Sequence, residues 1–366
     1  MKKRVLCVVG TRPEAIKMAP VILALKNEKK IDVRVLATAQ HRQMLDQVLS
    51  FFDIQPDIDL DLMQPNQSLT LLTSRLLNKL DDVLLVEKPD VVLVQGDTTT
   101  VMAVSLACFY HRIPIGHVEA GLRTWDIYNP FPEEANRVIT GRLAKWHFAP
   151  TQSSKENLLK EGVVENSIFV TGNTVIDALL MTAAKDITLD VSIPENQRMI
   201  LITSHRRENF GQPFREICAA IKYLANQNLD VFFLYPVHPN PNVKDVAYEI
   251  LGDCKNICLC EPLDYAPFVA AMKRSYFIIS DSGGVQEEAP ALSKPVLVLR
   301  EETERPEAVD LGVVRLLGAN YDKIIEVAQS LLDNEEVYRA MAKGISPYGD
   351  GYAASRIVDV LVEYLS

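Results

Sequence analysis

The sequence predicts an α/β protein made of two Rossmann-like, doubly wound domains that face each other across a cleft. The 366 residues exceed the usual size of a single hydrophobic core. Short β-branched runs alternate with amphipathic helical patterns along the chain, which is typical of parallel α/β units. The alternation stops at a polar, proline-containing stretch, residues 185–197, and then starts again. We interpret that stretch as a linker and expect the domains to be residues 1–175 and 176–352.

In the first half, the expected strands are short apolar runs that end at a polar or glycine-containing turn: Arg4–Gly10, Val33–Thr38, Val91–Gly96, Ile115–Val118, Trp146–Ala149 and Ile168–Val170. The amphipathic stretches between and after them are expected to be helices: Ile16–Lys26, Gln40–Phe51, Leu69–Glu87, Val101–Tyr110, Glu133–Leu143 and Ser153–Glu161. Pro89 and Pro114 precede two of the strands and mark the crossovers.

The second half opens with a helical pattern, Val175–Ala184, and closes on another, Ala353–Leu365. The expected strands between them are again short and apolar: Met199–Thr203, Asp230–Tyr235, Asn256–Cys260, Tyr276–Ser280, Pro295–Leu299 and Val313–Leu317.

The composition limits the kinds of binding partner and the cellular compartment that we expect for this chain. A formal charge of -10 argues against nucleic acid and acidic membranes, because both favour a basic face. The apolar run Val5–Val9 is too short for a signal peptide, and no window approaches the roughly 18 apolar residues of a membrane span. We therefore expect a cytoplasmic protein. The six cysteines are interpreted as buried thiols rather than metal ligands, because Cys254, Cys258 and Cys260 lack a second Cys/His pair at zinc spacing.

In doubly wound sheets, ligands bind outside the carboxyl ends of the strands. Polar side chains directly follow several expected strands: Arg12, Asp97, Glu119, His205, Arg206, His238 and residues 281–284. The loop 281–284 reads Asp-Ser-Gly-Gly and opens a helix, where free N–H groups favour a phosphate, although a plain turn is an equal alternative. Glu288, one turn later, is placed to accept ribose hydroxyls. Basic side chains are expected near the same strand ends and make a diphosphate the favoured ligand: Arg12, Lys17, Arg206, Arg207 and Arg305.

Two nucleotide classes are excluded by missing motifs. The chain contains no Gly-x-x-x-x-Gly-Lys-Ser/Thr loop, so it is not a P-loop NTPase. The first strand ends with Gly10 alone, and the Gly-x-Gly-x-x-type pattern at 349–354 follows no strand. We therefore expect neither a nicotinamide cofactor nor any other cofactor, and no metal.

Three carboxylates stand at the beginnings of loops or helices in the first half. Asp97 could be a helix N-cap, and Glu133 could be an ordinary first-turn acid. Glu119 ends a strand that is expected to be buried, so its carboxylate needs a partner or a function. Neighbouring carboxylates in a partly closed site have pKa values that move apart, which supplies an acid and a base.

Six motifs together identify a family resemblance that covers the chain in order. They are residues 10–20 (GTRPEAIKMAP), 95–99 (QGDTT), 117–124 (HVEAGLRT), 132–137 (PEEANR), 205–209 (HRREN) and 281–284 (DSGG). This set resembles the bacterial non-hydrolysing UDP-N-acetylglucosamine 2-epimerases. The resemblance implies a GT-B fold, a homodimer, a UDP-sugar substrate, and a last helix within 353–366 that packs back on the first domain. It also implies interconversion of UDP-GlcNAc and UDP-ManNAc, which supplies ManNAc for surface polysaccharides.

The resemblance assigns roles residue by residue. The residues expected to be catalytic are Asp97, Glu119, Glu133 and His205. The residues expected to bind substrate are Arg12, Lys17, Phe268, Ser282, Gly283, Gly284, Glu288 and Arg305. Leu263 departs from the family pattern, since relatives carry a polar residue beside the uracil there.

Some members of the family have a second, regulatory UDP-GlcNAc site. The residues that match it are Gln40, His41, Gln43, Arg207 and His238. Asn66 stands where those members carry arginine, and a polar helix start explains residues 40–43 equally well.

No carbonyl acidifies the hydrogen at C2 of the sugar, so simple deprotonation is out of reach. Elimination of UDP through a glycal intermediate avoids that step and fits these residues. The alternatives are a GT-B glycosyltransferase, a hydrolysing epimerase, and a non-catalytic UDP-sugar sensor.

Overall fold

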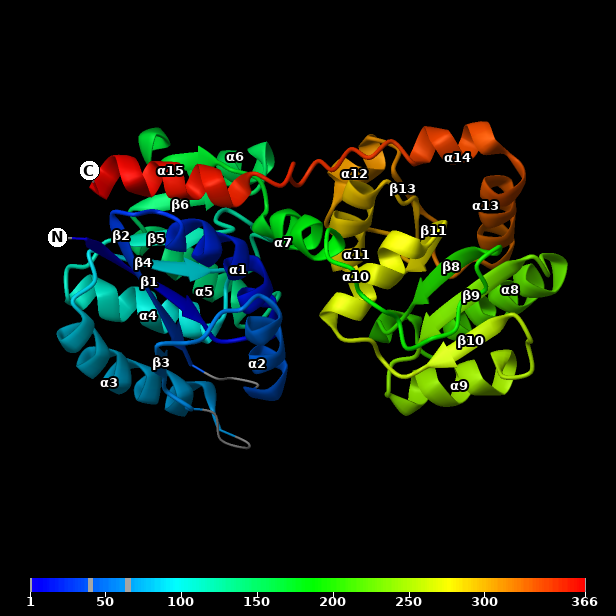
Figure 1. Cartoon of the computed structure of the whole chain (residues 1–366), viewed down its shortest axis with the longest axis horizontal. Coiled ribbons are helices and arrows are strands. Elements are labelled where there is room, and N and C mark those ends of the chain that lie inside the picture. Colours follow the sequence, from blue (N-terminus) through cyan, green and yellow to red (C-terminus); the bar gives the residue numbers. More distant parts are fainter. Residues whose placement is uncertain (1, 39–41, 63–66, 366) are drawn as a thin grey trace. The chain divides into compact units, whose positions relative to one another are not determined.

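The computed structural model describes residues 2–38, 42–62 and 67–365. Within these residues the chain forms two compact units, one of Met1–Ala178 with Tyr348–Ser366 and one of Leu179–Pro347 (Figure 1). Each unit is a parallel sheet covered by helices, so the predicted α/β class is confirmed. None of the helices in the described ranges combines the length and apolar character that crossing a bilayer requires.

The first unit contains a seven-stranded parallel sheet in the order β3-β2-β1-β4-β5-β6-β7, counted over the described residues. Its strands are β1 (Lys3–Val9), β2 (Ile31–Ala37), β3 (Ile58–Asp59), β4 (Val91–Gln95), β5 (Ile115–Val118), β6 (Trp146–Ala149) and β7 (Ile168–Val170). The strand order reverses direction between β1 and β4, which is where such sheets bind ligands. The two-residue edge strand β3 was not predicted, because it is too short to show a period.

Helices cover both faces of this sheet. They are α1 (Arg12–Lys26), α2 (Arg42–Phe51), α3 (Leu69–Glu87), α4 (Thr99–Tyr110), α5 (Glu133–Leu143), α6 (Gln152–Lys160), the 3-10 turn η1 (Glu165–Ser167), α7 (Thr174–Ala183) and α15 (Ala353–Leu365). On one face, leucines at helical spacing along α3 pack with α4 against alternate residues of β1 and β4. On the other face α1 contacts α2 and α15. Figure 1 shows α3 and α4 on the opposite side of β1 from α15.

The second unit contains a six-stranded parallel sheet in the order β10-β9-β8-β11-β12-β13 within the described residues. Its strands are β8 (Arg198–Thr203), β9 (Val231–Pro236), β10 (Ile257–Cys260), β11 (Phe277–Ser280), β12 (Val296–Val298) and β13 (Val314–Leu316). The order reverses between β8 and β11, so this sheet has its own ligand-binding position.

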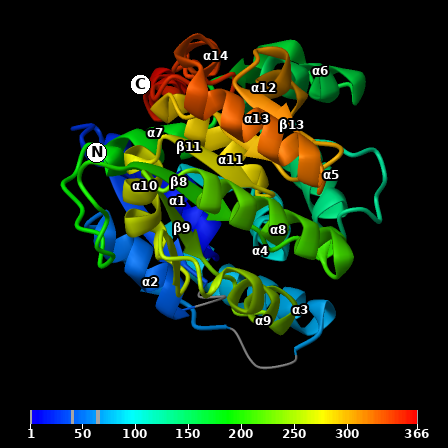
Figure 2. The same cartoon turned by 90° about the vertical axis from the view of Figure 1, so that its right-hand side faces the viewer.

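The helices of the second unit are α8 (Gln212–Gln227), α9 (Pro241–Leu251), α10 (Tyr265–Arg274), α11 (Gly283–Glu288), α12 (Pro306–Asp310), α13 (Tyr321–Asp333) and α14 (Glu335–Met341), with 3-10 turns η2 (Arg207–Asn209) and η3 (Ala289–Leu292). Three of them, α8, α9 and α13, share one apolar core with alternate residues of β8, β9 and β11. Figure 2 shows α8 between α13 and α9 on this face.

Local capping explains where two helices of the first unit begin. Thr11 caps α1 and forms a capping box with Glu14, and proline is tolerated in a first helical turn. The helix therefore begins at Arg12, four residues before the predicted start. Thr98, rather than Asp97, caps α4 by accepting from the N–H of Val101. The N-cap alternative for Asp97 is therefore wrong, and its side chain is available for other contacts.

The chain leaves the first unit inside α7 and returns before Tyr348. Residues 185–197 lie wholly in the second unit. This stretch is therefore not the linker between the units that its composition predicts. It is held there by α10, because Arg274 donates to the carbonyls of Pro194, Glu195 and Gln197. The last helix packs on the first unit, where Tyr364 meets Trp146 edge to face at 4.6 Å.

Candidate active site

Glu119 lies at the carboxyl end of the first sheet and is held there by three side chains. It follows β5 directly, with a positive φ of 65°, and its side chain is 8% exposed. Lys17 Nζ lies 2.6 Å from Oε1 and 2.7 Å from Oε2. Gln95 Nε2 also donates to Oε2, and Asn173 Nδ2 donates to Oε1 at 3.1 Å. The buried acid therefore has a cation and two amides as partners, all of which donate hydrogens to it.

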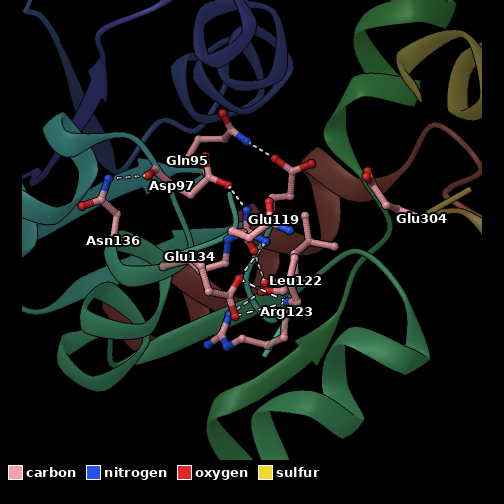
Figure 3. A network of polar contacts seen from close by, with 12 residues as sticks. Gln95, Asp97, Glu119, Leu122, Arg123, Glu134, Asn136 and Glu304 are labelled. Carbon is pink, nitrogen blue, oxygen red and sulfur yellow. Dashed lines mark hydrogen bonds and ion pairs between the residues drawn. The ribbon is translucent and has the colours of Figure 1, made fainter. Parts of the chain in front are cut away.

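Asp97 follows β4, the neighbouring strand, and its side chain is paired with a different cation. Arg137 Nη2 lies 2.7 Å from Asp97 Oδ2, and Asn136 Nδ2 donates to the Asp97 carbonyl at 2.9 Å. His117 Nε2 lies 2.7 Å from the carbonyl of Gly96, and burial lowers the pKa of His117 to about 3. Figure 3 shows the Asn136 amide directed at Asp97 and the Gln95 amide directed at Glu119.

The carboxylates of this unit influence one another. Burial raises the pKa of Asp97, and the Arg137 guanidinium opposes that shift. The charges of Glu119 and Glu133 raise it further, so both acids lie within electrostatic range of Asp97. Glu133 is the first residue of α5 and is only partly buried. The structure therefore brings together three of the four residues that were expected to be catalytic.

Glu134, next to Glu133, has a structural role. It is buried and accepts from the backbone N–H groups of Thr124 and Trp125, each at 3.2 Å. Arg137 Nη1 lies 3.4 Å from its carboxylate. This acid holds the loop after Glu119 against α5, as Figure 3 shows.

Glu14 has a similar role in the loop that carries Arg12, which begins α1. Its buried carboxylate accepts from the N–H groups of Gly10 and Thr11 and from Thr98 Oγ1 at 2.6 Å. Burial raises the pKa of Glu14 to about 7, and those three donors oppose the shift. One buried acid therefore ties the loop after β1 to the loop after β4.

The second unit uses a buried acid to organise cations. Asp281, fully buried after β11, accepts from the backbone N–H of His205 at 2.9 Å and of Arg206 at 2.9 Å, and from Ser204 Oγ at 2.8 Å. The His205 ring stacks on His238 with centroids 5.7 Å apart. Burial lowers the pKa of His205, and Asp281 opposes that shift.

The glycine loop lies against a guanidinium. A Cβ at Gly283 would lie 2.7 Å from Nη1 of Arg305, so a larger residue there would displace the guanidinium from its present position. Arg305 Nε in turn lies 2.6 Å from Glu287. Gly283 and Gly284 form the first turn of α11, whose N-terminus favours an anion.

Glu288, Phe268 and Leu263 are further residues of this unit that were singled out from the sequence. Glu288 ends α11, and Gly284 lies beside it, since a Cβ there would be 3.4 Å from Glu288 Oε1. Phe268 is a half-buried residue of α10, and Leu263 lies in the loop before that helix.

The predicted effector residues are only partly described. Gln40 and His41 lie outside the described residues, and so does Asn66, while Gln43 is in α2 without a described side chain. Arg207 begins η2, and the His238 ring stacks on the His205 ring within the second unit.

Several residues of the site were not singled out from the sequence. Gln95, Asn173, Glu14 and Arg137 each contact a predicted residue or its loop. Arg137 could have been found, because it follows Glu133 by one helical turn. The described part of the chain contains no group of three or more His, Cys, Asp or Glu residues that could hold a metal ion.

Comparison with known proteins gives one consistent family. The family model described as UDP-N-acetylglucosamine 2-epimerase matches residues 23–362. The protein of that name from Yersinia pestis is 55% identical over 368 residues, which cover 98% of each chain. The one from Escherichia coli K12 is 53% identical, also over 98% of each chain.

Solved structures agree. The UDP-GlcNAc 2-epimerase from Neisseria meningitidis, bound to UDP-GlcNAc, is 51% identical with a TM-score of 0.86, covering 98% of this chain and 100% of that chain. A putative UDP-N-acetylglucosamine 2-epimerase from Listeria monocytogenes is 48% identical with a TM-score of 0.94, covering 100% of this chain and 97% of that chain. A kitacinnamycin glycosyltransferase, only 12% identical, has a TM-score of 0.67 over 100% of both chains and shows the fold alone. The expected GT-B fold is confirmed.

Proposed function

Because this chain belongs to the UDP-N-acetylglucosamine 2-epimerase family of isomerases, we propose that it interconverts UDP-GlcNAc and UDP-ManNAc by eliminating and re-adding UDP. The observation that carries the proposal is the pair of acids at adjacent strand ends, Glu119 and Asp97, each held by its own cation. Binding alone does not require two such acids.

The reaction needs a proton to leave one face of C2 and another to arrive on the opposite face. The C2 hydrogen is not acidified by a carbonyl, so direct deprotonation is too slow. If the bond from C1 to the UDP oxygen breaks as C2 loses its proton, a C1–C2 double bond forms. Protonation of C2 on the other face and return of the UDP oxygen to C1 give the epimer. These reaction steps balance without an oxidant, a metal or water.

The acids of the first unit supply the two proton transfers. Glu119 accepts hydrogen bonds from Lys17, Gln95 and Asn173, which hold it as an oriented carboxylate, the form that a base must have before it takes a proton. Burial raises the pKa of Asp97 towards the range in which an acid can also donate. Glu133 lies within electrostatic range of Asp97 and assists the proton transfer by Asp97.

The second unit binds the nucleotide. The amides of Ser282, Gly283 and Gly284 and the guanidinium of Arg305 bind the diphosphate, whose negative charge grows as it leaves C1. His205, in the same unit, offsets part of that charge. Arg12, in the first unit, is assigned to UDP by the family resemblance alone. Phe268 contacts UDP, as the family resemblance implies, and Glu288 accepts the ribose hydroxyls.

We also propose a homodimer. Large apolar side chains are exposed at the carboxyl ends of α3 and α4, which contact each other: Leu85 (55% exposed), Val86 (76%), Phe109 (58%) and Tyr110 (67%). Light scattering should give twice the chain mass for the native protein, and Val86→Asp with Phe109→Asp should give the monomer mass. A native protein of monomer mass would contradict this assignment.

Cytoplasmic location, supply of ManNAc units for surface polysaccharides, and an effector site that includes Arg207 and His238 remain part of the proposal.

Products distinguish the proposal from its alternatives. Protein dialysed against EDTA and incubated with UDP-GlcNAc should give a mixture of the two UDP-sugars in the NMR spectrum, with no added NAD, metal or acceptor. Free UDP with free ManNAc would indicate a hydrolysing epimerase. Transfer that requires an acceptor would indicate a glycosyltransferase, and binding without any product would indicate a sensor.

A further inference from the structure

Asn173 lies between the Glu119 carboxylate and the segments by which the chain leaves and re-enters the first unit. It precedes α7, the helix in which the chain leaves the unit. Its side chain is buried, and its Nδ2 donates to Glu119 Oε1 at 3.1 Å. No family motif of the sequence contains it.

Both ends of the Asn173 side chain are fixed. Oδ1 accepts from the N–H of Val175 at 3.1 Å, the contact of a helix N-cap. That contact sets which end of the amide is oxygen, so Nδ2 is the atom that faces Glu119. The amide therefore cannot turn away from Glu119 without losing the cap of α7.

The backbone of Asn173 is tied to the returning chain. Its N–H donates to the carbonyl of Tyr348 at 2.6 Å, and Tyr348 is the first residue of the unit after the return. A Cβ at Gly349 would lie 3.4 Å from both the N and the O of Asn173. Asp177, one helical turn later in α7, accepts from the N–H of Ala354 at 2.8 Å and so caps α15.

We infer that Asn173 is a positioning residue that sets the orientation of the Glu119 carboxylate and links it to the chain crossing at Tyr348. The inference rests on the proposed function, because it gives Glu119 a role in proton transfer. Lys17 contacts both carboxylate oxygens and so fixes the charge, whereas Asn173 and Gln95 each contact a different oxygen and so fix the plane. Proton transfer depends on that plane, because a small misalignment of a reacting group lowers the rate strongly.

Two variants separate positioning from capping. Serine at 173 still caps α7 but cannot reach Glu119, so Asn173→Ser should fold normally and lower kcat on the order of 10-fold, with little change in KM. Asn173→Asp also keeps the cap but places a negative charge beside Glu119. It should move the acidic limb of the kcat profile to higher pH by about one unit, because an added negative charge disfavours ionisation of nearby carboxyls.

A matched control tests whether any asparagine cap behaves this way. Asn320 caps α13 in the second unit by accepting from the N–H of Lys323 at 3.0 Å. Asn320→Asp should leave kcat and its pH profile unchanged. A third variant tests the link to the crossing: Gly349→Ala should lower kcat in the native background and lower it less in the Asn173→Ser background, since the Glu119 contact is already lost.

The experiment measures kcat, KM and the pH profile of each variant, with urea unfolding to check that each one is folded. If native protein epimerises while folded Asn173→Ser and Asn173→Asp keep the native kcat and pH profile, the positioning role is overturned and the proposed function stands. If Gly349→Ala lowers kcat by the same factor in native protein and in Asn173→Ser, the link between Asn173 and the chain crossing is overturned. If native protein does not epimerise at all, the proposed function itself fails.

Discussion

The carboxyl ends of the two sheets carry opposite arrangements of charge. In the first unit, cations hold acids: Lys17 pairs with Glu119, and Arg137 pairs with Asp97. In the second unit, acids hold cations: Asp281 fixes the backbone of His205 and Arg206, and Glu287 fixes Arg305. The same fold therefore presents acids in one unit and anion-binding groups in the other.

This difference follows from the chemistry that each unit is proposed to perform. A carboxylate that exchanges protons must be partly shielded and kept in one orientation, and a neighbouring cation does both. A diphosphate is bound better by backbone N–H groups and guanidinium, which need acids behind them to keep their geometry. Glu14 and Glu134, buried acids of the first unit that accept backbone N–H groups, have a third role, which is to shape the loops.

The largest expected effect comes from removing proton transfer in the first unit. Glu119→Gln, Asp97→Asn and Glu133→Gln keep the shape of the side chain, and urea unfolding should show that each variant folds although the amide loses one acceptor oxygen. Each should lose on the order of 10²-fold or more in kcat, the usual scale for a missing acid or base. Calorimetry should show native affinity for UDP in all three. A variant that loses UDP affinity but keeps its turnover would contradict the division between the units.

Changes in the second unit should have the reverse signature. Gly283→Ala places a Cβ 2.7 Å from the Arg305 guanidinium, so Arg305 must move and UDP affinity should fall about 10-fold, roughly the worth of one charge-assisted contact. His205→Ala should weaken UDP binding and also slow turnover, and Phe268→Ala should mainly weaken binding. The measurement is calorimetry with UDP beside steady-state kinetics. Unchanged affinity in all three variants would show that these residues do not hold the nucleotide.

The third effect is smaller and concerns pH. Arg137 lowers the pKa of Asp97 against the effect of burial, so Arg137→Gln should raise that pKa further. The limb of the kcat profile that Asp97 governs should move to higher pH by about one unit, in both reaction directions. Arg137→Lys, which keeps the charge, is the matched control and should move it less. Two superimposable profiles for native protein and Arg137→Gln would mean that Asp97 does not titrate in the reaction.

The sequence was sufficient for most of the architecture, because apolar periods and turn residues are local signals. Ile115–Val118, Leu69–Glu87 and Ala353–Leu365 were predicted with the bounds that the structure shows. Helix α1 begins at Arg12 rather than at the predicted Ile16, because the capping box of Thr11 and Glu14 starts a helix whose first turn accommodates a proline. Residues 185–197 look like a linker by composition, and only the contacts of Arg274 show that they belong to the second unit.

The site was predicted less completely, because partners come from distant elements. The sequence showed that Glu119 needed a partner, yet its contacts come from α1, β4 and the start of α7. Nothing local to Asn173 points to residue 119, which is 54 positions earlier in the chain. Asp281 was noted as part of a glycine loop, but its role in holding His205 depends on the pairing of β8 with β11.

One measurement tests the central claim most directly. If the first unit exchanges protons at C2 while the second unit holds UDP, each turnover loses the C2 hydrogen to solvent. In deuterated water, NMR should show deuterium at C2 of the UDP-ManNAc that forms and of the UDP-GlcNAc that is recovered. A product that retains the original C2 hydrogen would require hydride transfer and would contradict the account, even if UDP proved to bind as proposed.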